Sequence, residues 1–232
     1  MTASENTVKD DSLKFPGMTP EIPDLCEGDY TELGRYFQEN AAEKTPVSWL
    51  VLRRLPEKAL LISSYALDCR PFEDWGSGKW KLSRIREWLN GAFIRETFSA
   101  SERKMILPCR QGVTVNPDFF MSDRDSCRSR IFLLSLEEAK TLFHSPRDRQ
   151  CRPTPYALKR GVRISSDTKF GGSGYCWWWL RSRGGAVSQA AFIDAYGMPD
   201  YAGSSITSRF LGVRPALWLR IPGITLEQGD PL

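Results

Sequence analysis

Few residues of this chain could perform catalysis or bind a metal. His144 is the only histidine, which removes most histidine-based catalytic triads and multi-histidine metal sites. The six cysteines are widely spaced and form no CxxC pair, so a structural zinc site is not expected. Buried free thiols are the simplest interpretation of these cysteines.

The sequence motifs of common enzyme classes are missing as well. There is no G-x-S-x-G, no P-loop, no H-E-x-x-H and no helix-opening G-x-G-x-x-G. The glycine-rich stretch at 170–175 precedes a tryptophan-rich strand rather than a helix, which disfavours a phosphate-binding loop. Asp123 and Asp125 lack the further oxygen ligands that a calcium loop supplies. We therefore predict no catalytic residue, no metal and no cofactor.

The least ordinary composition lies between residues 177 and 217. This segment begins with WWWLRS and ends with GVRPAL. We expect its tryptophans to be core anchors, and Arg181 and Arg214 to tie strand to loop through paired hydrogen bonds. Residues 184–211 in between contain no Lys and no Glu, although roughly three would be expected at the average density of the chain. A surface rich in Tyr, Ser, Gly and small residues is typical of antibody binding loops.

The elements that must position this segment can be read from periodicity and helix caps. Strands are predicted at 47–55 and 58–67 as a hairpin, at 132–134, and within 176–182, 190–196 and 213–221. Helices are predicted to begin after Ser83, Ser99, Ser135 and Thr154, with capping boxes at the second and third of these. Pro215 cannot donate to a ladder, so it should stand at a strand start, edge or bulge. The pattern predicts one α+β domain.

Bulk properties limit the possible partners. The chain has 232 residues and a formal charge of +4, which gives no strong attraction to nucleic acid. No stretch is long and apolar enough for a membrane span, and the N-terminus lacks a secretory core, which favours a cytoplasmic or phage-borne protein. Arginines cluster between residues 147 and 163; we interpret them as a solvated face, with an anion-binding patch as the alternative.

The motifs WWLRS and, about thirty residues later, GVRPAL resemble the variable half of C-type-lectin-fold target proteins of bacterial and phage diversity-generating retroelements. Upstream blocks, among them GDYTELGRYFQ, RIREWLNGAF and IFLLSLEEA, resemble a lectin-like bacterial domain family of unassigned function. The resemblance covers about residues 28–220. It implies a C-type lectin-like fold of the formylglycine-generating-enzyme-like subtype at 27–222, with a variable region at about 178–217. Residues 1–26 would be a flexible arm and 223–232 a tail.

In such proteins, adenine-directed reverse transcription rewrites positions between fixed framework residues. A template AAC codon changed at its adenines cannot encode Lys, Glu, Gln, Met or Trp, so Gln189 and Met198 should be fixed. Arg183 stands where the family commonly has proline. The implied framework is Trp178, Trp179, Leu180, Arg181, Ser182, Ala190, Ala191, Phe192, Gly197, Gly203, Gly212, Val213, Arg214 and Pro215. The implied variable, ligand-binding positions are Gly185, Ala186, Val187, Asp194, Ala195, Tyr196, Pro199, Asp200, Tyr201, Ser204, Ser205, Thr207, Ser208, Arg209, Phe210 and Leu211.

The resemblance implies a binding protein rather than an enzyme, with a protein or other macromolecule as its ligand. Aromatic residues such as Tyr201 and Phe210 would anchor the ligand, and charges would set specificity. A lectin-like domain without diversification and a structural module of a larger assembly stay open. An oxidase of the related fold would need a closely spaced cysteine pair, whereas Cys151 and Cys176 are 25 residues apart. The sequence does not indicate an oligomeric state.

Overall fold

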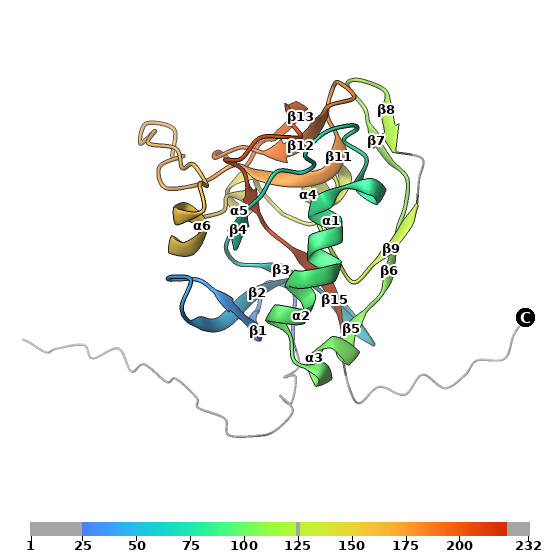
Figure 1. Cartoon of the computed structure of the whole chain (residues 1–232), viewed down its shortest axis with the longest axis vertical. Helices are drawn as coiled ribbons and strands as arrows, with labels where there is room; N and C mark the ends of the chain where they lie inside the picture. The colour runs from blue at the N-terminus through green and yellow to red at the C-terminus, as the bar shows by residue number, and fades with distance from the viewer. Residues whose placement is uncertain (1–24, 124–125, 222–232) are drawn as a thin grey trace, which may run out of the picture.

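The hairpin predicted from residues 47–67 forms the centre of a six-stranded sheet. Leu55 lies opposite Lys58 across a two-residue turn, as the pattern predicted. Strand order is β1-β2-β3-β15-β10, with β5 also paired to β15, so strands from both ends of the domain share one sheet. Figure 1 shows this sheet in the lower half of the molecule. Its strands are β1 (Tyr30–Phe37), β2 (Lys44–Leu55), β3 (Lys58–Ser63), β5 (Ile106–Leu107), β10 (Ile131–Phe132) and β15 (Ala216–Arg220).

A second sheet, in the upper half of Figure 1, contains the segment with the unusual composition. Its order is β13-β12-β11-β14-β4, and β11 and β14 pair in parallel. The predicted tryptophan strand and the strand after it are confirmed, whereas β13 escaped prediction because its Pro, Asp, Gly and Ser disfavour strands. Its strands are β4 (Asp68–Cys69), β11 (Trp178–Arg183), β12 (Gln189–Ile193), β13 (Pro199–Ser205) and β14 (Gly212–Val213).

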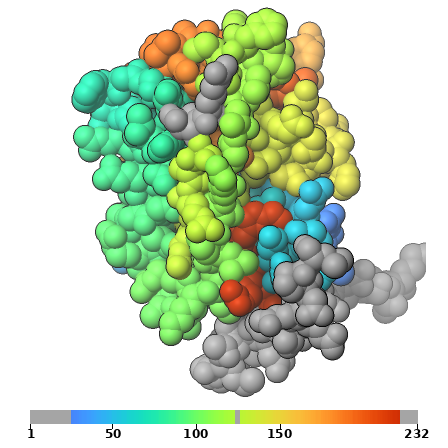
Figure 2. All heavy atoms as spheres, turned by 90° about the vertical axis from the view of Figure 1, so that its right-hand side faces the viewer, coloured from blue at the N-terminus to red at the C-terminus, as the bar shows by residue number. Residues whose placement is uncertain are grey.

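Two small hairpin-like sheets cross one side of the molecule. β6 (Cys109–Gln111) pairs with β9 (Cys127–Ser129), and β7 (Thr114–Asn116) pairs with β8 (Met121–Asp123). Figure 2 shows these strands in yellow-green beside the helical layer. None of these strands was predicted, because each is only three residues long and shows no usable alternation.

The four predicted helices begin at their predicted caps, whereas α5, which begins after Ser145, was not predicted. Ser83 accepts from the amide of Arg86, and Thr154 accepts from the amide of Ala157. The capping boxes at Ser99 and Ser135 are both present. The elements are η1 (Trp80–Leu82), α1 (Arg84–Trp88), η2 (Leu89–Phe93), α2 (Ile94–Thr97), α3 (Ala100–Met105), α4 (Leu136–Thr141), α5 (Pro146–Arg149) and α6 (Pro155–Lys159).

The helix predicted from Ser83 widens into a π-helical turn, η2, between α1 and α2. Asn90 in this turn donates to the carbonyls of Arg86 and Ile131, at 3.0 and 2.8 Å. Its side-chain oxygen accepts from the amides of Arg130 and Ile131. Asn90 therefore satisfies the backbone where β10 begins, and it fixes the helical layer against the six-stranded sheet.

Both sheets and the helices pack into one hydrophobic core. Trp49, Trp178 and Trp179 are fully buried. The indole nitrogens of Trp178 and Trp179 donate to the carbonyls of Arg149 and Arg70, each at 3.0 Å, so both rings are held by packing and a hydrogen bond. The α+β prediction is confirmed, and Pro215 stands just before β15, at a strand start.

The computed structural model describes residues 25–123 and 126–221. Nearly all of the expected arm (1–26), the whole tail (223–232) and Asp125 lie outside this range. Among the described residues, no helix is long and apolar enough to cross a membrane.

Core tryptophans should differ sharply from an exposed one in their effect on stability. Trp179→Ala should lower the free energy of unfolding by about 3–5 kcal/mol, because it opens a large cavity and removes a hydrogen bond. Trp75 is 79% exposed, so Trp75→Ala should change it by less than about 1 kcal/mol. Urea unfolding followed by circular dichroism measures both, and equal losses would contradict the assigned core.

Candidate ligand-binding surface

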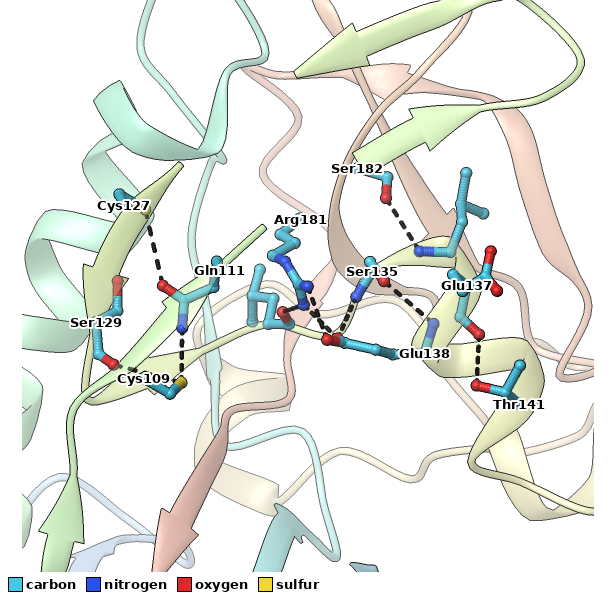
Figure 3. A network of polar contacts seen from close by, with 12 residues as sticks. Cys109, Gln111, Cys127, Ser129, Ser135, Glu137, Glu138, Thr141, Arg181 and Ser182 are labelled. Atoms are coloured by element: carbon cyan, nitrogen blue, oxygen red, sulfur yellow. Dashed lines mark hydrogen bonds and ion pairs between the residues drawn. The ribbon is translucent and has the colours of Figure 1, made fainter. Parts of the chain in front are cut away.

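The start of the unusual segment is clamped by a buried arginine. Arg181 in β11 pairs with Glu138 of α4, its Nη2 donating to Oε1 at 2.7 Å, and its Nη1 donates to the carbonyl of Leu133 at 2.9 Å (Figure 3). Glu138 also accepts from the Ser135 amide in the capping box. The hydroxyl of Ser182 accepts from the amide of Leu136. The expected structural role of Arg181 is confirmed.

The end of the segment is clamped in the same manner. Arg214 is 3% exposed, and its Nε donates to the carbonyl of Ser63 at 3.0 Å. Its Nη1 donates to the carbonyl of Arg149 at 3.3 Å, the acceptor that also serves the Trp178 indole. The guanidinium lies over the rings of Phe143 and Trp178. Arg214 thus ties the end of β14 to the six-stranded sheet, as expected.

Between the clamps, the implied variable positions form a strip along β12 and β13 rather than a single pocket. Ile193 lies opposite Pro199 and Gln189 lies opposite Ser205. The turn 194–198 and the loop after Ser205 therefore lie at opposite ends of the two strands, roughly 13 Å apart along β12 at about 3.3 Å per residue.

One end of the strip consists of two neighbouring loops, 184–188 and 205–208. The amide of Ile206 donates to the carbonyl of Ser188 at 3.0 Å, which joins them. Ser204 and Ser208 share a hydrogen bond of 2.8 Å, and Ser205 and Thr207 share one of 2.9 Å. This end presents several hydroxyl groups on an ordered backbone.

The opposite end is a turn that docks onto α5. Arg149 donates to the carbonyl of Gly197 at 2.7 Å, and Gln150 donates to the carbonyl of Ala195 at 2.9 Å. Tyr196 donates to the Asp167 carboxylate at 2.6 Å. This hydrogen bond lowers the pKa of Asp167 and raises the pKa of Tyr196. The carboxylate of Asp167, a residue outside the implied variable set, is therefore part of this end.

A third group, Arg209 and Phe210, lies away from both ends. The guanidinium of Arg163 lies 5.3 Å from the centre of the Phe210 ring, and the Arg163 amide donates to the Phe210 carbonyl. The Arg209 carbonyl accepts from the thiol of Cys69 at 3.1 Å. This group borders α6 instead of β13.

Two implied ligand-binding positions are corrected by the structure. Ala195 and Leu211 are fully buried, Ala195 because its turn docks onto α5 and Leu211 because it leads directly into β14. Tyr201 and Phe210 are half-buried and pack against the core, so their rings also support the fold. Ala186, Val187, Ser205, Thr207 and Arg209 are exposed, and the other nine positions are half-buried. Met198, expected to be fixed, is also exposed.

Sequence reasoning missed the hairpin β7–β8, which borders the strip. Asn116 is buried and donates to the carbonyls of Arg183 and Tyr201, at 2.9 and 2.7 Å. The ring of Phe119 packs against Gly185, where an added Cβ would lie 2.9 Å from it. A lone Asn carries no sequence signal of this role, whereas the apolar pair Phe119–Phe120 in a polar stretch could have been noticed.

The cysteines that the sequence separates by 25 residues meet in the structure. The Cys176 amide donates to the carbonyl of Cys151 at 2.8 Å, and the two thiols share a hydrogen bond. Burial, together with the bond to Cys151, raises the pKa of the Cys176 thiol well above its usual range. The spacing argument against proximity was wrong. Both side chains are buried, however, so they do not face an open pocket.

The remaining chemistry-bearing residues do not assemble a metal site. Within 25–123 and 126–221, no group of three or more His, Cys, Asp and Glu side chains could hold an ion. The buried carboxylate of Asp68 instead accepts from Tyr36, Arg70 and Arg160. These contacts join β4 to β1 and α6.

The architecture is α+β. The strip lies on the five-stranded sheet, which Arg181 and Arg214 fix to the rest of the fold. Residues 56–221 match the domain family of unknown function DUF6273, and the chain belongs to that family. No curated protein and no solved structure matches the chain.

Thiol reactivity should follow the burial of the cysteines. Burial raises the pKa of Cys69 and of Cys109 to about 11. At pH 8, on the order of one such thiol in a thousand is ionised, so iodoacetamide should modify both far more slowly than the exposed Cys26.

The measurement is a time course of peptide mass spectrometry on the native protein. Between pH 8 and 10, modification of Cys109 should accelerate about tenfold per pH unit, because its thiolate fraction grows at that rate below the pKa. Labelling of Cys69 as fast as Cys26 at pH 8 would contradict the structure.

Proposed function

We propose that this protein is a ligand-binding protein, in which a C-type lectin-like scaffold displays the strip 185–210 as a diversified surface. Its mechanism is recognition rather than chemistry, and its ligand is a protein or another macromolecule. Retroelement-driven hypermutation is the proposed source of the diversity.

The observation that carries the proposal is the division between buried framework and accessible variable positions. Of the implied framework residues, all except Phe192 and Gly203 are buried. Of the implied variable positions, five are exposed, nine are half-buried, and only Ala195 and Leu211 are buried. Residues 184–211 lack Lys and Glu, which an ordinary surface segment would carry. The segment with the unusual composition is thus also the one in which buried framework residues alternate with more accessible positions.

Glycines support the separation between scaffold and display. Gly203 has a φ of +79° and packs so closely that a Cβ there would lie 2.5 Å from the carbonyl oxygen of Ala190. Gly184 packs against the Ala202 carbonyl in the same tight fashion. These contacts hold the loop 184–188 onto β13 through backbone alone, so neighbouring side chains are free to vary.

Exposed aromatic residues beside the loops favour a macromolecular ligand. The Gly78 amide donates to the Val187 carbonyl at 2.8 Å, which brings the Trp75–Gly78 loop to this end of the strip. Trp75 and Phe120 are 79% and 87% exposed. Large exposed apolar side chains mark interaction sites, and aromatic residues are enriched in protein interfaces.

Substitution by Asn, the residue encoded by a template AAC codon, should separate display from scaffold. Ser205→Asn should change the free energy of unfolding by less than about 0.5 kcal/mol, because Ser205 is exposed. Gly203→Asn should cost more than about 2 kcal/mol, because its Cβ meets the Ala190 carbonyl. Chemical unfolding of the two variants tests this, and comparable losses would remove the structural basis of the proposal.

The gene's surroundings provide the direct test of diversification. We expect a reverse transcriptase and a near-copy of codons 178–217 that differs from the gene only at adenines of the copy. Differences should fall in codons of the implied variable positions and spare Gln189, Met198 and the framework. Sequencing the locus tests this expectation. A locus without such a copy would contradict diversification and favour a lectin-like domain of fixed specificity.

A further inference from the structure

A basic hollow lies where the middle of β2 and the chain just after β3 meet the segment 147–152. Its volume is about 510 Å³, within the range of small-molecule sites. Three arginines line it, Arg147, Arg152 and Arg214. None of the implied variable positions lines it, so it is distinct from the strip.

The most buried of these arginines, Arg214, has no carboxylate partner among the described residues. Arg214 is 97% buried, and its Nε and Nη1 bind backbone carbonyls, but Nη2 has no hydrogen-bond partner among the described residues. Arg181, the comparable buried arginine, has its charge neutralised by Glu138, although its Nε has no hydrogen-bond partner in the described part of the chain. A buried guanidinium without a counter-charge favours an anion from outside.

A second arginine is held in place at the wall. The guanidinium of Arg152 lies 4.5 Å from the centre of the Tyr175 ring, and it packs on Gly174, where any Cβ would clash with it. It forms no ion pair with a described carboxylate. Its two stacking contacts reduce the conformational entropy that binding an anion would cost.

The remaining lining is polar and aromatic. Asp148 is the acidic residue of the lining, and its carboxylate already accepts from the amide and hydroxyl of Ser145, at 2.9 and 3.0 Å. Three guanidiniums against this carboxylate leave a formal charge of about +2, which a dianion would neutralise. Tyr30 and Tyr65 line the hollow with exposed rings that the core does not require.

We propose that this hollow binds a phosphate monoester, with the phosphoryl group between Arg152 and Arg214 and the organic group against the tyrosine rings. Guanidinium groups bind phosphate oxygens through paired, charge-assisted hydrogen bonds. The arginine run 147–163 was interpreted from the sequence as a solvated face. Arg147 and Arg152 are exposed, as that interpretation expects, and they also line the hollow, as its anion-binding alternative requires.

Titration calorimetry on the full chain with phenyl phosphate, inorganic phosphate and benzoate tests the proposal. Phenyl phosphate should bind with one site, severalfold more tightly than inorganic phosphate, because its ring adds aromatic contact. It should also bind more tightly than benzoate, which has the ring but one charge. Tighter binding of benzoate would overturn the phosphate assignment, and absence of binding by all three would overturn the site.

Variants locate the binding without disturbing the buried clamp. Arg152→Ala should weaken phenyl phosphate binding by about tenfold or more, because a charge-assisted pair is lost. Arg128 is an exposed residue of β9 outside the hollow, so Arg128→Ala removes the same charge and should leave the affinity unchanged. Circular dichroism should show both variants folded. Equal weakening by the two would reveal nonspecific attraction and overturn the site, whatever the outcome for the strip.

Discussion

The ion pair between Glu138 and Arg181 is the constraint on which the rest of the structure depends. Glu138 closes the capping box that starts α4, and it neutralises a guanidinium buried beneath the second sheet. A buried cation that loses its partner is strongly destabilising, so neither residue can change alone. Because Arg181 also binds the Leu133 carbonyl, the pair fixes β11 to the chain just before α4.

Arg214 performs the equivalent task at the other end of the segment, with carbonyls in place of a carboxylate. Between these two anchors, sheet pairing and close glycine contacts hold the backbone. These contacts do not depend on the identity of most of the intervening side chains. A surface can vary in sequence only where the fold draws its stability from elsewhere. The placement of the buried contacts therefore supports the proposed display function.

The two anchors differ in a way that matters for binding. The charge of Arg181 is neutralised by Glu138, whereas Arg214 has no carboxylate partner among the described residues and lines a basic hollow. The strip and the hollow are separate surfaces that share the β14–β15 connection through Arg214. Their separate placement would allow the proposed display surface to vary without altering the proposed anion site.

The sequence by itself determined the local elements: the caps at Ser83, Ser99, Ser135 and Thr154, the hairpin 47–67 and the buried tryptophans all depend on short-range patterns. It also indicated the roles of Arg181 and Arg214 from their apolar neighbours. Tertiary structure alone decided the hairpin β7–β8, the burial of Ala195 and Leu211, the meeting of Cys151 with Cys176, and the basic hollow. Each of these depends on contacts between residues distant in sequence, which composition and periodicity do not encode.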